Sequence, residues 1–441
     1  MSANEFDGAL LKLKQDIASL YGPDFSTRVT KAWAEIIEEL GKVSERVSLK
    51  GSEYIPQVNF SELPTLSQEK LDEIRRIGTV VIKDIVEDED ARGWQKSLKD
   101  FVKANPDVPG QFSHTPHRGP ARLEFSKQDF PQTTNSFSSC MEARSHPNVL
   151  AASTWLNNLY RDSSRSNIEG VDLSTPLTYA DRFRMRHPGG GWTFFSPHID
   201  GGSIERWQDD AFRSCFDDIL SGDWRKHDPF ALSGRLEARS SLYDRANQAS
   251  VFRTFQGWLA MSETAPTQGT LKVFPDLLLS NAYIILRPFF RPLVTSSPEI
   301  LDLKNWVYDI SYDEFPGIYP WDGGYAGPRP TPVSHPHMML ETTMTSVPKV
   351  MPGDAVFWHC DVVHSVEVDH TGQEDSAVMY IPAVPTTPNN KAYIEKQKDS
   401  FLKSVSPPDF PRRSQAFPGI AREVGDLISS EGVLAMGLVA G

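Results

Sequence analysis

Apolar residues recur at helical spacing through the first part of the chain. Between Phe6 and Leu20 they lie three or four positions apart, and the same spacing from Val29 to Val43 predicts a second helix after a glycine–proline break. A third helix is expected at about Gln68–Arg76. We interpret the first two helices as packing against the rest of the protein, because the pattern is too short for a coiled coil.

The following segments mix strand and helix signals. The β-branched run Gly78–Ile82 predicts a buried strand, and the acidic residues Glu87–Asp90 open a helix that Asn105-Pro106 ends. From about 107 to 175 the pattern is irregular, with one helix expected at about Val149–Tyr160.

From Tyr179 onward the pattern changes to short strands punctuated by glycine and proline. The expected strands are Tyr179–Arg186, Phe194–Ile199, Val251–Ala260, Leu271–Phe274, Met338–Thr345, Ala355–Trp358 and Ser376–Ile381. The chain holds 33 prolines in 441 residues, more than the roughly 5% of an average protein. Such punctuation is typical of a β-sandwich or jelly-roll barrel, here interrupted by insertions at about 203–250 and 287–334. The last forty or so residues look helical.

Composition excludes several classes of protein. Lys and Arg total 45 against 58 Asp and Glu, a net charge of −13, so a nucleic acid or an anionic membrane is a poor partner. Three cysteines exclude a disulfide scaffold and a four-thiolate zinc site. With no secretory-type apolar core at the N-terminus and no apolar run of about 18 residues, we expect a soluble cytoplasmic protein. Its expected partner is a small-molecule substrate, and the oligomeric state stays open.

Two short segments carry the residue types of a metal site. His198 and Asp200 are two positions apart in an expected strand, so their side chains point to the same face. Farther on, Gly353-Asp354 opens a turn and a strand with His364 beyond its end. Two imidazoles and one carboxylate form the facial triad that binds Fe(II) and leaves positions open for a co-substrate and O2.

An isolated His-x-Asp motif is weak, because chance produces it often. The chain contains a second example, His359-Cys360-Asp361, and for most of its 11 histidines an ordinary surface or core role is the default. The first motif is favoured by its context, which is a strand before it, glycines after it and the downstream strand that leads to His364.

With these motifs the sequence resembles the Fe(II)/2-oxoglutarate dioxygenases of the double-stranded β-helix fold. It is most similar to the phytanoyl-CoA-dioxygenase-like group, and within it to the DUF1479 family over nearly the whole chain. The segments that carry the resemblance are Gly78–Ile82, His198–Asp200, Gly269–Pro275 and Gly353–His364, in this order.

The resemblance implies an α+β protein, a double-stranded β-helix (jelly-roll, cupin-like) barrel flanked by N- and C-terminal helices. Residues 1–105 would form the N-terminal helices and the strand that leads into the barrel. Residues 106–390 would form the barrel with both insertions, and residues 391–441 a C-terminal helical segment.

The resemblance also assigns the iron ligands to His198, Asp200 and His364. His364 is favoured because the small residue Ser365 follows it, as in the family, whereas His359 at an odd spacing would face the other side of a regular strand. The rival pair His335 and His337 flanks a proline in an expected loop.

The chain departs from the family at the 2-oxoglutarate anchor. Relatives place an Arg or Lys about ten to fifteen residues past the distal histidine, where it pairs with a carboxylate, but residues 365–390 contain neither. Instead Arg182, Arg184 and Arg186 share one face of an expected strand, and we infer that this face looks into the cavity.

Other interpretations of the anchor remain. Salt bridges at a sheet edge would explain any one of the three arginines equally well. Lys272 and Arg253 are alternative cations, and Ser376 and Tyr380 could add hydrogen bonds.

The expected substrate-binding residues are Phe195, Trp358 and Tyr380, aromatic residues close in sequence to the iron ligands. The two insertions are expected to cover the barrel mouth. The resemblance implies oxidation of a C–H bond with Fe(II), 2-oxoglutarate and O2, as hydroxylation, desaturation or oxidative cyclisation of a small polar substrate such as an amino acid of secondary metabolism. The alternatives are a cupin-type iron enzyme or isomerase that does not use 2-oxoglutarate, and a degenerate barrel used for binding.

Overall fold

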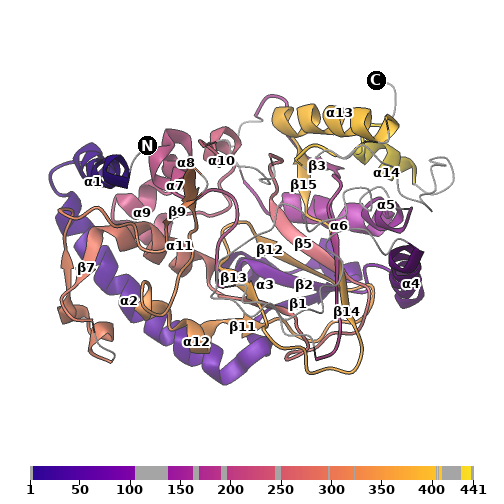
Figure 1. The fold of residues 1–441 in the computed structure, drawn as a ribbon, viewed down its shortest axis with the longest axis horizontal. Coiled ribbons are helices and arrows are strands. Elements are labelled where there is room, and N and C mark those ends of the chain that lie inside the picture. Colours follow the sequence, from indigo (N-terminus) through magenta and orange to yellow (C-terminus); the bar gives the residue numbers. More distant parts are fainter. Residues whose placement is uncertain are drawn as a thin grey trace.

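The protein is described by a computed structural model, a mixed α/β structure of helices and several small sheets (Figure 1). The structure describes residues 3–104, 138–161, 168–189, 196–243, 250–295, 298–321, 323–403, 405, 407–409 and 429–438. Within these residues, no helix is long and apolar enough to span a membrane.

The α-helices differ widely in length. Their bounds are α1 Ala3–Leu20, α2 Phe25–Lys50, α3 Gln68–Ile77, α4 Asp88–Ala104, α5 Ser138–Arg144, α6 Pro147–Asn157, α7 Glu205–Gln208, α8 Asp210–Ser214, α9 Asp217–Leu220, α10 Ser233–Glu237, α11 Leu277–Leu286, α12 Leu340–Thr343, α13 Pro388–Leu402 and α14 Ser430–Ala435. The helices expected near residues 6–20, 29–43, 68–76, 87–104 and 149–160 are therefore confirmed, with shifted ends.

The strands are short. Their bounds are β1 Gln57–Asn59, β2 Thr79–Lys83, β3 Asp172–Leu177, β4 Phe183–Arg186, β5 Phe255–Ala260, β6 Leu271–Val273, β7 Phe290–Pro292, β8 Trp306–Tyr308, β9 Tyr319–Trp321, β10 Gly324–Ala326, β11 Thr345–Ser346, β12 Ala355–His359, β13 His364–Val366, β14 Ser376–Tyr380 and β15 Val384–Thr386.

Two sheets position the residues of interest. The first sheet has the order β1-β2-β12-β5-β14-β4, and the second has the order β11-β6-β13. His198, which follows β4 in the chain, forms an antiparallel bridge with His364 at the start of β13 and so extends the second sheet. From β4 to β14 the chain therefore crosses repeatedly between the two sheets. No sheet in the described part closes into a barrel.

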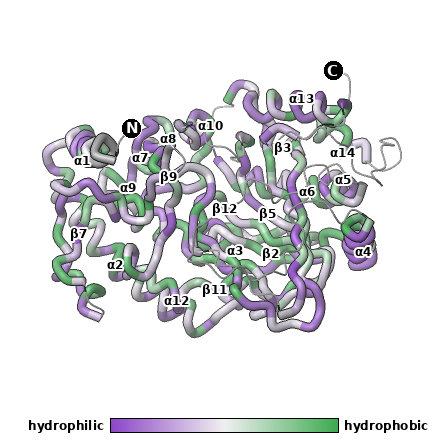
Figure 2. Tube along the Cα trace, viewed as in Figure 1, coloured by the Kyte–Doolittle hydropathy of each residue, from purple (hydrophilic) through white to green (hydrophobic). Residues whose placement is uncertain are grey.

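Helices cover one face of the first sheet. α4 and α6 lie beside it in Figure 1, and their residues Trp94, Leu98 and Leu156 share one apolar core with Phe357 of β12. Figure 2 shows apolar stretches running along the strands in the interior of this half of the molecule. All six residues of β5 are buried, and because successive side chains point to opposite faces, both faces of the sheet are covered at this strand.

A second core forms around α2, the long helix at the lower left of Figure 1. Trp33 stacks on Tyr283 of α11 and on Phe290 of β7, with ring centroids 4.8 and 4.5 Å apart. The insertion at 203–250 forms α7 to α10 and supplies Trp207 and Phe216 to this core. The insertion at 287–334 forms β7 to β10. The insertions therefore build core as well as surface.

Gly78 joins α3 to β2 where the chain passes close to the strand leading to His364. Its φ is +75°, and a Cβ there would meet Val362 Cγ2 at 2.8 Å and Leu277 Cβ at 2.9 Å. Glycine is required both by the left-handed conformation and by this close approach.

The strand expected at Met338–Thr345 is wrong over most of its length. Met338 ends a 3-10 helix, α12 follows, and only Thr345 belongs to a strand. Met338, Leu340 and Met344 are buried in the second core, so packing against α2 selects a helical turn over the extended pattern. The strands expected from Tyr179 and Val251 begin later than predicted, at Phe183 and Phe255.

Buried histidines make the fold sensitive to acid. Burial first, and then the charge of Arg235, lowers the pKa of His227 and of His359 from 6.5 to about 3, and burial with Arg287 lowers the pKa of His337 to about 4. Below pH 6.5 the unfolded chain therefore takes up protons that the folded chain does not, and stability falls with pH.

We expect each of these histidines to lower the free energy of unfolding by about 2 kcal/mol between pH 6.5 and 5. Urea denaturation at pH 7, 6 and 5 measures this loss. In His227→Gln the slope of the unfolding free energy against pH should be smaller by the equivalent of about one proton. Equal unfolding free energies at pH 7 and 5 would contradict the expectation.

Candidate metal centre

His198, Asp200 and His364 converge at the edge where the second sheet meets the chain after β4. Their ligand atoms all lie within 4.8 Å of one another. The Nε2 atoms of His198 and His364 are each 3.5 Å from a different oxygen of Asp200, and the two imidazole rings are 4.2 Å apart between centroids. The spacing suits three ligands around a common point.

The main chain fixes both histidines. The amide of each donates to the carbonyl of the other, at 3.0 and 2.9 Å. Each Nδ1 contacts the carbonyl two residues earlier, Ser196 at 2.8 Å and Val362 at 3.0 Å. A protonated Nδ1 would donate to that carbonyl and leave Nε2 unprotonated, with its lone pair toward Asp200.

The charge state also fits a divalent metal. Burial, with the neighbouring His364, lowers the pKa of His198 to about 4, so its imidazole is neutral at pH 7. Partial burial opposes ionisation of Asp200, but contact with the histidines and the charge of Arg253 hold its pKa well below the ordinary value. The neutral His198 imidazole, the ionised Asp200 carboxylate and the imidazole of His364 form a donor set that suits Fe(II).

A buried charge cluster connects the two segments that carry the ligands. Both oxygens of Asp361 are bound, by Arg206 at 2.8 Å and by Arg235 at 2.6 Å, and all three side chains are at most 5% exposed. Arg206 also donates to the carbonyls of Asp200 and Gly201, at 3.3 and 3.1 Å. Asp361, three residues before His364, thus holds the main chain at Asp200 through one guanidinium.

His359, Cys360 and Asp361 also lie close together but do not fit a metal. The Asp361 carboxylate already pairs with two arginines, and burial raises the pKa of the Cys360 thiol. His359 is fully buried, stacks on Tyr160, and has Nε2 3.1 Å from the carbonyl of Pro229. Its role is packing.

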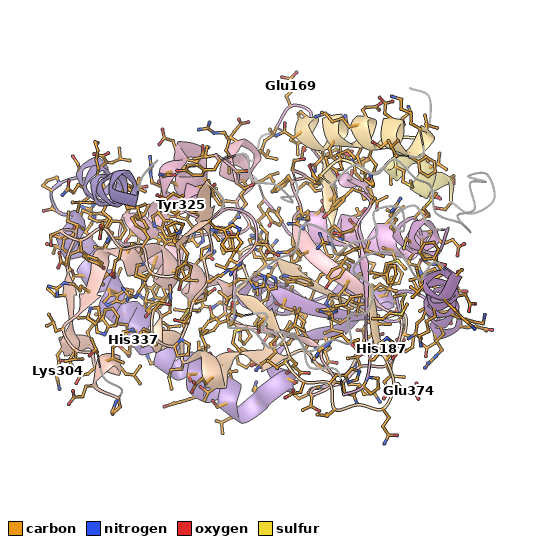
Figure 3. All side chains as sticks on the ribbon, in the orientation of Figure 1. Glu169, His187, Lys304, Tyr325, His337 and Glu374 are labelled. Atoms are coloured by element: carbon orange, nitrogen blue, oxygen red, sulfur yellow. The ribbon has the colours of Figure 1, made fainter. Side chains whose placement is uncertain are left out.

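The rival pair His335 and His337 lies elsewhere. Both are buried in the second core, where His337 contacts Trp33 and Trp306 and its Nδ1 is 2.9 Å from the Tyr283 hydroxyl. Figure 3 places His337 next to α2.

The arginines of β4 occupy different environments. Arg184 is directly opposite Val378 of β14, and Arg186 is opposite Ser376. The Arg186 guanidinium donates to the carbonyls of Gly269, Glu367 and Val368 at 2.7 to 3.1 Å, which favours a structural role. Arg182 was expected on the same strand but lies just before β4, where it is 43% exposed and its Nε is 3.3 Å from Asp181.

Lys272 is not brought to the metal centre. Val273 pairs with His364 across β6 and β13, whereas Lys272 pairs with Ser365, so Lys272 points to the opposite face of the second sheet. Ser376 receives a hydrogen bond from Thr264 at 3.3 Å.

Of the expected substrate-binding residues, Trp358 is beside the centre, with its ring 5.4 Å from that of His364. Tyr380 is half-buried and lies opposite Trp258 on the first sheet. Phe195 lies outside the described residues.

Sequence reasoning missed the Asp361 cluster and Arg329. The amide of Ile199 donates to the carbonyl of Pro328 at 3.0 Å, and the charge of Arg329 contributes to the lowered pKa of His198. The second insertion therefore contacts the His-x-Asp segment. Arg253, considered only as an alternative cation, lies where its charge acts on Asp200, and its guanidinium is 3.4 Å from the Tyr179 hydroxyl.

Comparisons with known proteins give the relatives of the chain. A family model described as Gig2-like matches residues 6–438. The Escherichia coli K12 protein YbiU, described as uncharacterized, is 32% identical over 406 residues, which cover 90% of this chain and 86% of YbiU.

Solved structures agree with this match. GlcNAc Inducible Gene 2, GIG2 (DUF1479), from Candida albicans has a TM-score of 0.81 at 29% identity, covering 98% of this chain and 89% of GIG2. A Salmonella typhimurium LT2 protein described as a candidate oxidoreductase has a TM-score of 0.75 at 28% identity, covering 98% of this chain and 97% of its own.

Removing the charge of Asp361 tests the cluster. We expect Asp361→Asn to lower the free energy of unfolding by about 3–5 kcal/mol, because two arginines stay buried with one partner less. Since Arg206 orients the chain at Asp200, Fe(II) affinity should also fall by about 10–100-fold. Urea denaturation and Fe(II) titration measure the two effects.

The matched control is Asp210→Asn, because Asp210 is 91% exposed in its pair with Arg213. This variant should change stability by less than about 1 kcal/mol and leave Fe(II) affinity unchanged. Equal iron affinity in Asp361→Asn and the control would refute the link between the cluster and the metal centre.

Proposed function

The chain belongs to the Gig2-like family, and we propose that it is a non-haem Fe(II)- and 2-oxoglutarate-dependent oxygenase that oxidises a C–H bond of a small polar substrate. The observation that carries the proposal is the convergence of His198 and His364 on the two oxygens of Asp200, each at 3.5 Å. This donor set binds Fe(II) on one face and leaves the remaining positions open.

The strand order supports the same conclusion. Between β4 and β14 the chain alternates between the two sheets. β4, β5, β12 and β14 belong to the first sheet, and the bridge at His198, β6, β11 and β13 belong to the second. Two sheets built by such crossing form a jelly roll. We therefore propose the double-stranded β-helix as the core of the protein, with the metal centre at the end of the second sheet.

The chain's own residues would hold and orient the reactants. The imidazoles of His198 and His364 and the carboxylate of Asp200 would bind iron, which when bound supplies the reactivity toward O2. The carbonyls of Ser196 and Val362 orient the imidazoles, and the Asp361 cluster orients the chain at Asp200. The packed first sheet would keep the inner side of the centre dry.

The register of β4 and β14 supports Arg184 as the anchor of 2-oxoglutarate. Val378 lies in the segment about ten to fifteen residues past the distal histidine, where most of the dioxygenases that the sequence resembles carry the cation that pairs with a carboxylate. Arg184 is its cross-strand partner, so a cation on the neighbouring strand would occupy the same part of the cavity.

A second candidate function is iron chemistry without 2-oxoglutarate. It is favoured by the absence of Arg and Lys from residues 365–390. Formation of succinate and CO2 from 2-oxoglutarate distinguishes the two, because only the first candidate produces them. A small amino acid remains our proposal for the substrate.

Replacing either histidine should remove the metal. We expect His198→Ala and His364→Ala each to lower bound Fe(II) from about one per chain to nearly none, since loss of one ligand of three breaks the facial set. Iron analysis after anaerobic loading measures the loss, and circular dichroism checks the fold. His335→Ala is the matched control and should keep its iron. Unchanged iron in both site variants would overturn the assignment.

Reversing the charge at Arg184 tests the anchor. With Fe(II) bound under anaerobic conditions, 2-oxoglutarate should give a weak visible charge-transfer band, and Arg184→Glu should abolish it while iron stays bound. Lys272→Glu, with the same charge reversal on the opposite face of the second sheet, should keep the band. If the band in Arg184→Glu appears with the same 2-oxoglutarate midpoint as in the wild type, Arg184 is not the anchor.

A further inference from the structure

Three polar side chains form a row across neighbouring strands of the first sheet. Trp358 of β12 is directly opposite Thr79 of β2 on one side and Gln256 of β5 on the other. Residues directly opposite one another point to the same face of a sheet, so the three side chains lie next to one another.

The row is buried, and each of its members has an unpaired polar atom. Thr79, Trp358 and Gln256 are 0, 3 and 6% exposed. Within the described part of the chain, Thr79 Oγ1, Trp358 Nε1 and Gln256 Nε2 have no hydrogen-bond partner. Buried donors without acceptors are rare and costly, and three neighbouring ones indicate a place where a polar group binds.

The row lies at the inner side of the metal centre. The Trp358 ring is 5.4 Å from the His364 ring. Asp200 is 41% exposed, so solvent reaches the centre at that ligand, whereas Thr79, Trp358 and Gln256 are buried. A substrate would reach the open side, and a group bound against the row would be enclosed.

We propose that Thr79, Trp358 and Gln256 donate hydrogen bonds to the oxygens of a 2-oxo dicarboxylate bound beside His364. The inference rests on the proposed function and locates its co-substrate. An indole N–H and an amide NH₂ only donate, and an ionised carboxylate only accepts, so the two are complementary.

A cation, Arg184, lies farther along the same face of the first sheet and could bind the second carboxylate. Gln256, Trp258 and Ala260 alternate onto one face of β5; Ala260 pairs with Val378, and Val378 pairs with Arg184. The row would hold the end of the dicarboxylate near the metal, and Arg184 the far end.

The test is anaerobic titration of Fe(II)-loaded protein with 2-oxoglutarate, followed by the visible charge-transfer band. Gln256→Leu and Trp358→Phe each remove one donor group. Leu nearly keeps the volume of Gln, and Phe keeps an aromatic ring at position 358. Each should raise the Kd of 2-oxoglutarate about tenfold or more, the effect of losing a hydrogen bond to a charged group, while the Kd of Fe(II) is unchanged.

Trp33→Phe is the matched control. Trp33 Nε1 is also buried without a partner, but in the second core, so this variant should bind 2-oxoglutarate like the wild type. Unchanged 2-oxoglutarate affinity in both Gln256→Leu and Trp358→Phe would refute the role of the row in binding 2-oxoglutarate. It would not contradict the proposed function. A wild-type protein that binds Fe(II) but gives no band would overturn the proposed function and the row with it.

A measurement on the wild-type protein tests the proposal even if the variants fail to fold. With Zn(II) in place of Fe(II), the indole N–H resonance of Trp358 should shift when 2-oxoglutarate is added and that of Trp33 should not. A Trp358 resonance that does not move would overturn the proposal.

Discussion

The reciprocal main-chain pairing of His198 with His364 is the contact on which the candidate metal centre depends. These residues are far apart in the sequence, yet the amide of each donates to the carbonyl of the other. Residues paired in this way point to the same face, so the pairing brings both imidazoles to one side. Asp200, two residues after His198, then reaches both Nε2 atoms.

The Asp361 cluster reinforces this pairing from the other side. Burial alone would raise the pKa of Asp361, but Arg235 and Arg206 hold it well below the ordinary value, so the carboxylate stays charged. Arg206 comes from α7 and Arg235 from α10, both in the insertion at 203–250. The insertion is therefore part of the apparatus that shapes the centre, and its apolar residues anchor it in the second core.

Local sequence patterns were sufficient for elements whose pattern agrees with their packing. The apolar stripe of α2 predicts its buried face, and the β-branched run of β2 predicts a central strand, because both patterns reflect burial directly. Met338–Thr345 reads as a strand but packs against α2 as a turn and a short helix, since contacts distant in sequence decide it. The spacing of His198 and Asp200 predicts that they share a face, but only the sheet register shows that His364 joins them.

The partners of polar groups were the least predictable feature. Nothing near Asp361 in the sequence indicates that two arginines of an insertion neutralise it, and nothing near Trp358 indicates that Thr79 and Gln256 lie beside it. Both arrangements follow from strand pairing and loop packing over long separations. Arg184 and Arg186 alternate onto one face of β4, but Arg182 lies before the strand, and Arg186 donates to main-chain carbonyls, which the sequence does not show.

The most direct test of the metal centre is anomalous diffraction from crystals loaded with Fe(II) under anaerobic conditions. The expected result is one strong iron peak within bonding distance of His198 Nε2, His364 Nε2 and an oxygen of Asp200. A peak at His359, Cys360 and Asp361, or no ordered iron at all in a crystal that contains the intact centre, would contradict the account.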